Sequence, residues 1–359
     1  MRGVKGIIHA IDYHTGGQPV RVLTGGLPPI LGRTMREKAD YVKNELDWIR
    51  TAVIHEPRGH KDMFAVILTE PCHPDADFGV IWIDNPGVYI GMCGHGTFGV
   101  AAMLADMGYV RRDDDPIVLT LDTPGGLVRV SIRRQPGPTT TTIENVPAFH
   151  LASATVDVEG VGPVPIDVAY GGLFFVQVDV DRLPPSLNLE QVETFVQLWP
   201  RLREATMRAV PLWHPQPQVQ LEYTNSFFYQ RRADGRTIKN VMVYGDGGID
   251  RSPCGTGTCA YLATAVARGE LAIGEEIRMI GSLGSEFRGR ALESAPIGPD
   301  RMGIRPAITS PAFLSGTHQF ILNEEDPLTY GFELPTDSGF RVASGAASGG
   351  ARQASGSSL

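Results

Sequence analysis

The chain has 359 residues, of which 42% are hydrophobic and 20% are charged, as is typical of a globular protein. Its formal net charge of -8 argues against a general nucleic-acid binder, whose surface is usually basic. No apolar run approaches the roughly 20 residues that span a bilayer, and His9 and Asp12 interrupt the N-terminal apolar stretch, so we expect neither a membrane partner nor a signal peptide. The 4 cysteines are too few for a disulfide scaffold, which favours a cytoplasmic, reducing location.

Short runs rich in β-branched and aromatic residues alternate with turns in the first third of the chain. They predict strands over residues 7–11, 51–54, 64–68, 78–82 and 117–121. One amphipathic helix interrupts these strands. Thr34 and Glu37 form a capping box at its start, and apolar residues then recur at helical spacing from Met35 to Ile49.

Farther along the chain, a second helix is predicted to begin at Asn188 and to run toward Ala209. Gln191 stands in the position of a capping-box residue, and Pro200 predicts a kink or break. Residues 337–359 are almost entirely Ser, Gly and Ala, with a few Arg and Gln. Such a segment cannot bury apolar area, so we predict a disordered tail after a fold that ends near residue 334.

Two segments of the sequence match each other without gaps. Both read Cys-Gly-x-Gly-Thr, followed by mostly small or apolar residues; they start at Cys93 and Cys254 and end at Gly108 and Gly269. Subtracting 93 from 254 gives an offset of 161 residues, about half the folded length. We therefore predict two similar halves that face each other.

Each repeat is typical of a glycine-rich turn that leads into a helix. The residues after the turn have little polar surface, which indicates a buried helix, and Gly108 and Gly269 stand where a C-terminal glycine cap belongs. We expect an α/β fold in which each half is a curved, mostly antiparallel sheet wrapped around a central helix. A cysteine would then lie at the N-terminal end of each helix, called the helix mouth below.

A helix mouth presents unpaired backbone amides and about half a positive charge, so it binds anions such as a carboxylate. The same field is expected to favour the thiolate, since lowering a thiol pKa by roughly one unit from about 8.5 gives about a quarter thiolate at pH 7. If both mouths face one site, Cys93 and Cys254 flank the α-carbon of a bound amino acid from opposite sides. One thiolate would remove the α-proton while the other thiol delivers a proton, which inverts the stereocentre.

Other interpretations of these residues explain less of the pattern. Cys93 with His95 provides too few ligands for a zinc site, and the Walker lysine of a phosphate loop is absent. A cysteine-dependent hydrolase would use one cysteine and leave the other unexplained. A binding module would not need thiols at both helix mouths. Cys72 and Cys259 lack a matched partner and are expected to be core residues.

At these residues the sequence resembles the proline racemase family, and the resemblance extends over about residues 7–334. Its most specific marks are residues 92–97 and 250–258. Supporting marks lie at residues 12–16, 57–60, 71–79, 170–172 and 326–328.

The resemblance implies two pseudo-symmetric halves, as in diaminopimelate epimerase, with the active site in the cleft between them. It also implies a homodimer, a small-molecule substrate, and no metal, pyridoxal phosphate or nucleotide cofactor. We predict that the first half comprises residues 1–125 plus 306–334 and the second residues 126–305. The cleft is expected to close on substrate, because an open site would expose the carbanion to water.

Carried onto this chain, the resemblance makes Cys93 and Cys254 the acid/base pair, and Asp250 the contact of the ring amine. His95 would contact the substrate or the opposite thiol, and His14 and His60 would support the site structurally. The substrate carboxylate would be held by backbone amides of the following residues: Gly94, His95, Gly255 and Thr256.

Three activities share this scaffold. The trans-3-hydroxyproline dehydratases have Thr in place of one catalytic cysteine, so both cysteines argue against that branch here. Phe64 and Tyr244 match aromatic positions of the racemases and would close an apolar pocket over an unsubstituted ring, which favours interconversion of L- and D-proline. The alternative is a 4-hydroxyproline 2-epimerase, because the Tyr244 hydroxyl can satisfy a substrate hydroxyl. Further departures from the racemase pattern are Gln18 and Ala65.

Overall fold

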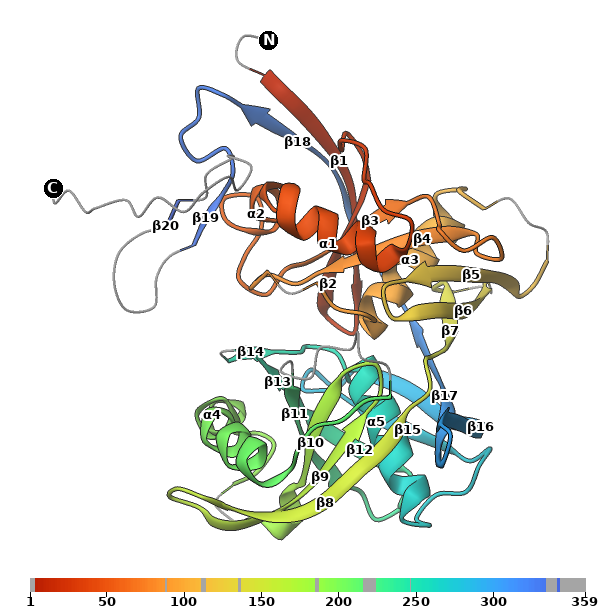
Figure 1. Ribbon diagram of the computed structural model, residues 1–359, viewed down its shortest axis with the longest axis vertical. Coiled ribbons are helices and arrows are strands. Elements are labelled where there is room, and N and C mark those ends of the chain that lie inside the picture. Colours follow the sequence, from red (N-terminus) through yellow and green to blue (C-terminus); the bar gives the residue numbers. More distant parts are fainter. Residues whose placement is uncertain are drawn as a thin grey trace, which may run out of the picture.

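The computed structural model describes residues 4–87, 89–110, 114–134, 137–184, 187–215, 224–245 and 247–333, together with the backbone of 341–342. The chain forms two lobes stacked along the longest axis of the molecule (Figure 1). The first lobe is mostly N-terminal and the second mostly central in sequence, and β17 (Arg301–Pro311) lies beside β7 (Thr140–Glu144) where the lobes join. No helix in the described part of the chain is long and apolar enough to span a membrane.

The first lobe contains most of the N-terminal elements. Its strands are β1 (Val4–Thr15), β2 (Gln18–Gly25), β3 (Phe64–Thr69), β4 (Phe78–Ile83), β5 (Ile117–Thr123), β6 (Gly126–Arg133), β7 and the returning β18 (Phe313–Asn323). Its helices are α1 (Met35–Glu45), α2 (Trp48–Ile54) and the central α3 (Gly94–Asp106).

The second lobe repeats this arrangement. Its strands are β8 (Phe149–Val158), β9 (Gly162–Tyr170), β10 (Phe174–Asp179), β11 (Thr224–Arg231), β12 (Thr237–Val241), the short pair β13 (Val243–Tyr244) and β14 (Gly248–Ile249), β15 (Glu276–Ile280), β16 (Glu286–Gly298) and β17. Its helices are the short η1 (Val180–Arg182), α4 (Val192–Ala209) and the central α5 (Gly255–Ala267).

Strand pairing confirms the predicted duplication. In the first lobe, β1 to β6 pair in the order antiparallel, parallel, antiparallel, parallel, antiparallel. The strands β9, β10, β11, β12, β15 and β16 follow the same order in the second lobe. α3 stands between β4 and β5 in the chain, as α5 stands between β12 and β15. β3 and β11 are therefore equivalent strands of the two halves.

The two central helices are buried almost throughout, as their apolar sequences predict. Each ends at a glycine in the left-handed region, Gly108 with φ 73° and Gly269 with φ 69°, where a side chain would be strained. The strands of both lobes form one continuous 16-stranded sheet, which packs around α3 in the first lobe and around α5 in the second. Packing along each helix fixes the position of its N-terminus. This rigidity is what positions the two cysteines.

The Thr34 half of the capping box is confirmed, because the Glu37 amide donates to Thr34 Oγ1 at 3.1 Å. The Glu37 carboxylate accepts from the amide of Arg33 at 2.8 Å, one residue before the expected partner. The strand predicted over residues 51–54 is wrong: these residues form the end of helix α2. Their β-branched side chains favoured a strand, but Ala52 and Val53 pack with Ile49 in a second apolar cluster, and that burial outweighs local preference.

The second predicted helix begins later than expected, at Val192, and ends at Ala209. It continues through Pro200, which lies on its exposed side, while the opposite face packs Phe195 and Leu198 into the core. The predicted tail 337–359 lies outside the described residues except for β20 (Arg341–Val342), whose backbone pairs with β19 (Phe332–Glu333).

Candidate active site

The two helix mouths are built alike. Cys93 and Cys254 are the residues immediately before α3 and α5. The hydroxyl of Thr97 donates to the Cys93 carbonyl at 2.7 Å, and that of Thr258 donates to the Cys254 carbonyl at 2.7 Å. The amides of the same threonines also donate to these carbonyls, at 3.0 and 2.9 Å. The threonine of each repeat thus closes the first helical turn, and the amides that precede it have no partner within the helix.

The two mouths touch each other. A Cβ atom added to Gly94 would lie 2.7 Å from the Cα of Gly255, and one added to Gly255 would lie 2.8 Å from the Cα of Gly94. Real Cβ atoms do not approach backbone this closely, so the first glycine of each repeat is required by the contact between the halves. The contact aims both sets of amides at one space.

That space is a small cavity of about 40 Å³. All the site residues predicted from the sequence line it. The first half contributes Phe64, Cys93, Gly94 and His95. The second half contributes Tyr244, Asp250, Cys254, Gly255 and Thr256.

Cys93 lies against a histidine. Its Sγ is 3.4 Å from Nδ1 of His95, whose ring packs edge-on against Phe64 at a centroid distance of 4.6 Å. Burial lowers the pKa of His95 to about 3, so its imidazole is neutral at physiological pH. Burial raises the pKa of the Cys93 thiol well above its ordinary value.

Cys254 has a different environment. Its φ of 64° makes it the one non-glycine residue in the left-handed region among those described. The amide of Gly257 donates to its Sγ at 3.3 Å. Burial raises its pKa well above the ordinary value, and the nearby charge of Asp250 adds to this. We expected the helix field to lower the pKa of each thiol, but removal from water outweighs it at both mouths.

Asp250 supplies negative charge beside Cys254. Its side chain is buried, and its Oδ1 accepts a hydrogen bond from the Ser252 amide at 2.8 Å. The Ser252 hydroxyl in turn accepts from the Cys254 amide at 3.1 Å, so this run of residues is held by its own side chains. Burial raises the pKa of Asp250 to about 6, which leaves it ionised at neutral pH and suited to a cationic partner.

Tyr244 presents its ring to the cavity, 5.7 Å from the Phe64 ring, while its hydroxyl donates to Oδ1 of Asp62 at 3.4 Å. Arg251 donates to the other oxygen of Asp62 at 2.7 Å. Gln18 accepts from the Arg251 amide at 2.9 Å and donates to the Asp62 carbonyl at 3.2 Å. These contacts join the two halves beside the cavity and occupy the Tyr244 hydroxyl.

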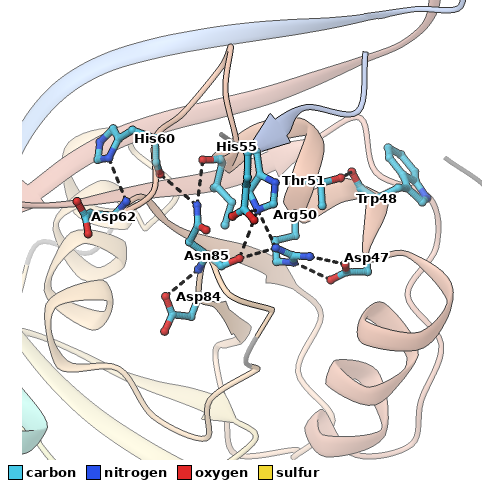
Figure 2. Close-up of polar contacts among 11 residues, drawn as sticks. Asp47, Trp48, Arg50, Thr51, His55, His60, Asp62, Asp84 and Asn85 are labelled. Atoms are coloured by element: carbon cyan, nitrogen blue, oxygen red, sulfur yellow. Dashed lines mark hydrogen bonds and ion pairs between the residues drawn. The ribbon is translucent and has the colours of Figure 1, made fainter. Parts of the chain in front are cut away.

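Two polar residues of the cavity were missed by the sequence prediction. Asp84 follows β4, and its Oδ1 accepts from the Asn85 amide at 2.7 Å. Figure 2 shows the polar contacts that anchor this corner: the Asn85 side chain donates to the His60 carbonyl at 3.2 Å, and Arg50 donates to the Asn85 carbonyl. Asn225 is the second residue of β11 and lines the same cavity. A carboxylate directly after a strand was a usable signal for Asp84, whereas nothing local distinguished Asn225.

The other singled-out residues lie away from the cavity lining. His14 Nδ1 accepts from the Gly17 amide at 3.3 Å, and His60 Nδ1 accepts from the Asp62 amide at 3.2 Å. Both side chains therefore stabilise the backbone of a nearby turn. Cys72 and Cys259 do not line the cavity, and Cys259 packs inside α5. None of the four cysteines is in a disulfide.

Known proteins resemble this chain over nearly its whole length. Residues 10–333 match the family model described as proline racemase. The proline racemase of Clostridioides difficile is 37% identical over 330 residues, which cover 91% of this chain and 98% of that protein. A 4-hydroxyproline 2-epimerase of Streptosporangium roseum is also 37% identical, over 332 residues that cover 92% of this chain and 99% of that protein.

The solved structure of a hydroxyproline epimerase from Agrobacterium vitis, with bound trans-4-OH-L-proline, superimposes with a TM-score of 0.83 at 29% identity, covering 94% of this chain and 98% of that one. The match thus spans both halves and the cavity between them. The chain belongs to the proline racemase family, whose members named here are isomerases that act as racemases or epimerases.

Proposed function

We propose that this protein interconverts L- and D-proline by a two-thiol mechanism, with Cys93 and Cys254 as the acid/base pair. One observation carries the proposal: two cysteines begin two helices whose first residues touch, and both sulfurs line one small cavity. Neither Cys72 nor Cys259 is placed in this way.

The cavity has the groups that the reaction requires. The substrate carboxylate is bound by backbone amides at the two helix mouths, through Gly94, His95, Gly255 and Thr256, where the helix dipoles favour an anion. Its ammonium is bound by Asp250, whose carboxylate is buried and ionised at neutral pH. The pyrrolidine ring packs against the apolar part of the lining, which includes Phe64 and Tyr244.

The chemistry is one proton removed and one proton delivered. The thiolate of one cysteine forms an S–H bond with the α-proton, and the electron pair of the broken C–H bond delocalises into the carboxylate, where the mouth amides stabilise it. The thiol of the other cysteine then gives its proton to the opposite face of the α-carbon. Burial raises the pKa of both thiols, which keeps the delivering thiol protonated and makes the thiolate a strong base.

The apolar wall favours proline. Phe64, Ile90, Met92, Leu173 and Met242 line the cavity, and none of these five side chains can hydrogen-bond a ring hydroxyl. Asn225 is the neutral amide in the same lining. Epimerisation of 4-hydroxyproline is the second candidate, because the relative from Streptosporangium roseum carries that name and the Agrobacterium vitis protein binds trans-4-OH-L-proline. The presence of both cysteines argues against the dehydratase, and a hydrolase leaves one of them unused.

Further parts of the proposal concern the whole protein. We infer that it works without a metal or organic cofactor, as a homodimer in the cytoplasm. We also infer that the first half runs to about residue 144 and includes the returning strand, because β6 and β7 lie in the first lobe; the boundary predicted at residue 125 would separate β6 from β5, with which it pairs. The strand that returns to the first lobe, β18, supports this division because it pairs with β1.

The test replaces each cysteine with serine. Cys93→Ser and Cys254→Ser should each lower the racemisation of L-proline by at least about 1,000-fold, since a hydroxyl is a poor base at neutral pH. Cys259→Ser is the matched control, because Cys259 lies in α5 five residues after Cys254 but outside the cavity. Chiral chromatography in D2O should show solvent deuterium at the α-carbon of the product. Racemisation without exchange, or normal rates in either site variant, would overturn the mechanism.

A further inference from the structure

We propose that Asn225 is the residue that sets the ring specificity of the site, by hydrogen-bonding a hydroxyl on the substrate ring. This inference rests on the proposed function and assigns a specificity residue to it. Asn225 lines the cavity, and its side chain is 2% exposed. Its Oδ1 is buried without a hydrogen-bond partner in the described part of the chain.

The unsatisfied amide indicates a missing partner. A buried carbonyl oxygen without a hydrogen bond costs about 1–3 kcal/mol, so such atoms are retained where something else satisfies them. Asn225 belongs to the wall of a ligand cavity, and the ligand is therefore the natural partner. Rotation of the amide exchanges its oxygen and nitrogen in nearly the same space, so it can accept from a hydroxyl or donate to it.

The position of Asn225 matches that of Phe64 in the other half. β3 and β11 are equivalent strands, and each starts at the cavity. Phe64 packs against His95 in the first turn of α3. Phe227 lies on the same face of β11 as Asn225, two residues farther on. It packs against Gly257 in the first turn of α5, so closely that a Cβ on this glycine would clash with its ring. The duplicated fold thus places an aromatic ring on one side of the substrate and an amide on the other.

The other polar groups of the cavity suit different parts of the substrate. Asp84 and Asp250 are carboxylic acids that complement the positive charge of the ammonium. The Tyr244 hydroxyl already donates to Asp62. The Thr256 hydroxyl and the His95 ring lie beside the two thiols, at 3.9 Å from Cys254 Sγ and 3.4 Å from Cys93 Sγ. Asn225 is therefore the remaining neutral group, and it matches a neutral hydroxyl, which both donates and accepts.

The experiment measures kcat/KM for L-proline and for trans-4-hydroxy-L-proline, by chiral chromatography, in the wild type and in Asn225→Leu. Leucine has a similar shape but forms no hydrogen bond. The ratio of hydroxyproline to proline kcat/KM should fall about ten- to hundredfold, since an unpaired substrate hydroxyl is then buried.

Gln177→Leu is the matched control. Gln177 lies on the neighbouring strand β10, and both polar atoms of its buried side chain lack partners in the described structure, but it does not line the cavity. Its replacement should leave the ratio unchanged. The wild type should also prefer trans-4-hydroxy-L-proline over trans-4-fluoro-L-proline by at least about fivefold, a comparison that does not depend on a variant that folds.

The outcomes separate the two proposals. Turnover of L-proline alone, an unchanged ratio in Asn225→Leu, or an equal loss for both substrates would each overturn the role of Asn225 and leave the two-thiol racemase intact. An equal loss would mean that Asn225 binds the ammonium or merely shapes the wall. If the wild type turns over neither amino acid, the proposed function itself fails.

Discussion

The mouths of α3 and α5 have the same backbone but different electrostatic surroundings. In both, a threonine hydroxyl and amide bind the cysteine carbonyl, and a glycine packs against the glycine of the other mouth. Cys93, however, lies beside a neutral histidine, whereas Cys254 lies beside a buried carboxylate. A duplicated motif therefore reproduces geometry, while each half supplies its own neighbours.

This difference has a chemical consequence. A racemase needs two proton-transfer groups in equivalent positions, one on each face of the α-carbon. It does not need equivalent surroundings, because the substrate is itself asymmetric: its ammonium and carboxylate occupy different sides of the α-carbon. Asp250 in one half and His95 in the other give the two sides of the cavity different charge, as the proposed mechanism requires.

The largest effect is expected from the shared feature, the contact between glycines. Gly94→Ala and Gly255→Ala should each lower racemisation by more than about 100-fold, because the new methyl group would overlap the backbone of the other mouth and separate the sulfurs. Gly6→Ala is the control, since its Cβ would meet nothing within 4 Å. Rates and melting temperatures measure the effect. A marked loss in only one of the two variants would mean that the mouths do not support each other equally.

The next largest effect is expected at Asp250, the buried carboxylate that lies beside Cys254. Asp250→Asn should lower kcat/KM about 100-fold, because the ammonium loses its charged partner. Burial raises the pKa of Asp250 from 3.8 to about 6, so ionisation costs the folded state about 3 kcal/mol as the pH rises through 6. Without substrate, the variant should therefore be more stable than the wild type near pH 7 and equal to it near about pH 4. Urea unfolding at both pH values measures this difference. An identical stability gain at both would assign it to shape rather than charge.

The smallest effect is expected at His95. Its pKa is lowered to about 3 by burial, so it stays neutral where the enzyme works and does not form an ion pair with Cys93. His95→Asn should lower kcat/KM about tenfold through lost positioning, and the pH profile should keep its shape between about pH 5 and 9. His73→Asn, at an exposed histidine, is the control. If the variant removed a titration near pH 6 from the profile, His95 would be a charged participant.

Much of the site was predictable from the sequence because its key features are local. The repeat at Cys93 and Cys254 predicted both the duplication and the two cysteines that meet at the cavity, and Thr34 with Glu37 marked a helix start that the structure confirms. Other features depend on remote neighbours. Residues 51–54 have the side chains of a strand, yet they form a helix because the core into which they pack is built by other elements.

The amino-acid sequence by itself determined the two helix mouths, since a Cys-Gly-x-Gly-Thr turn before an apolar helix is specified by neighbouring residues. Only the tertiary structure decided what those mouths can do. Burial raised the pKa of both thiols against the helix field, and the meeting of the two halves brought Asp84 and Asn225 into the cavity wall. Solvation and long-range contact depend on which surfaces fold against one another, and no local pattern of residues contains that information.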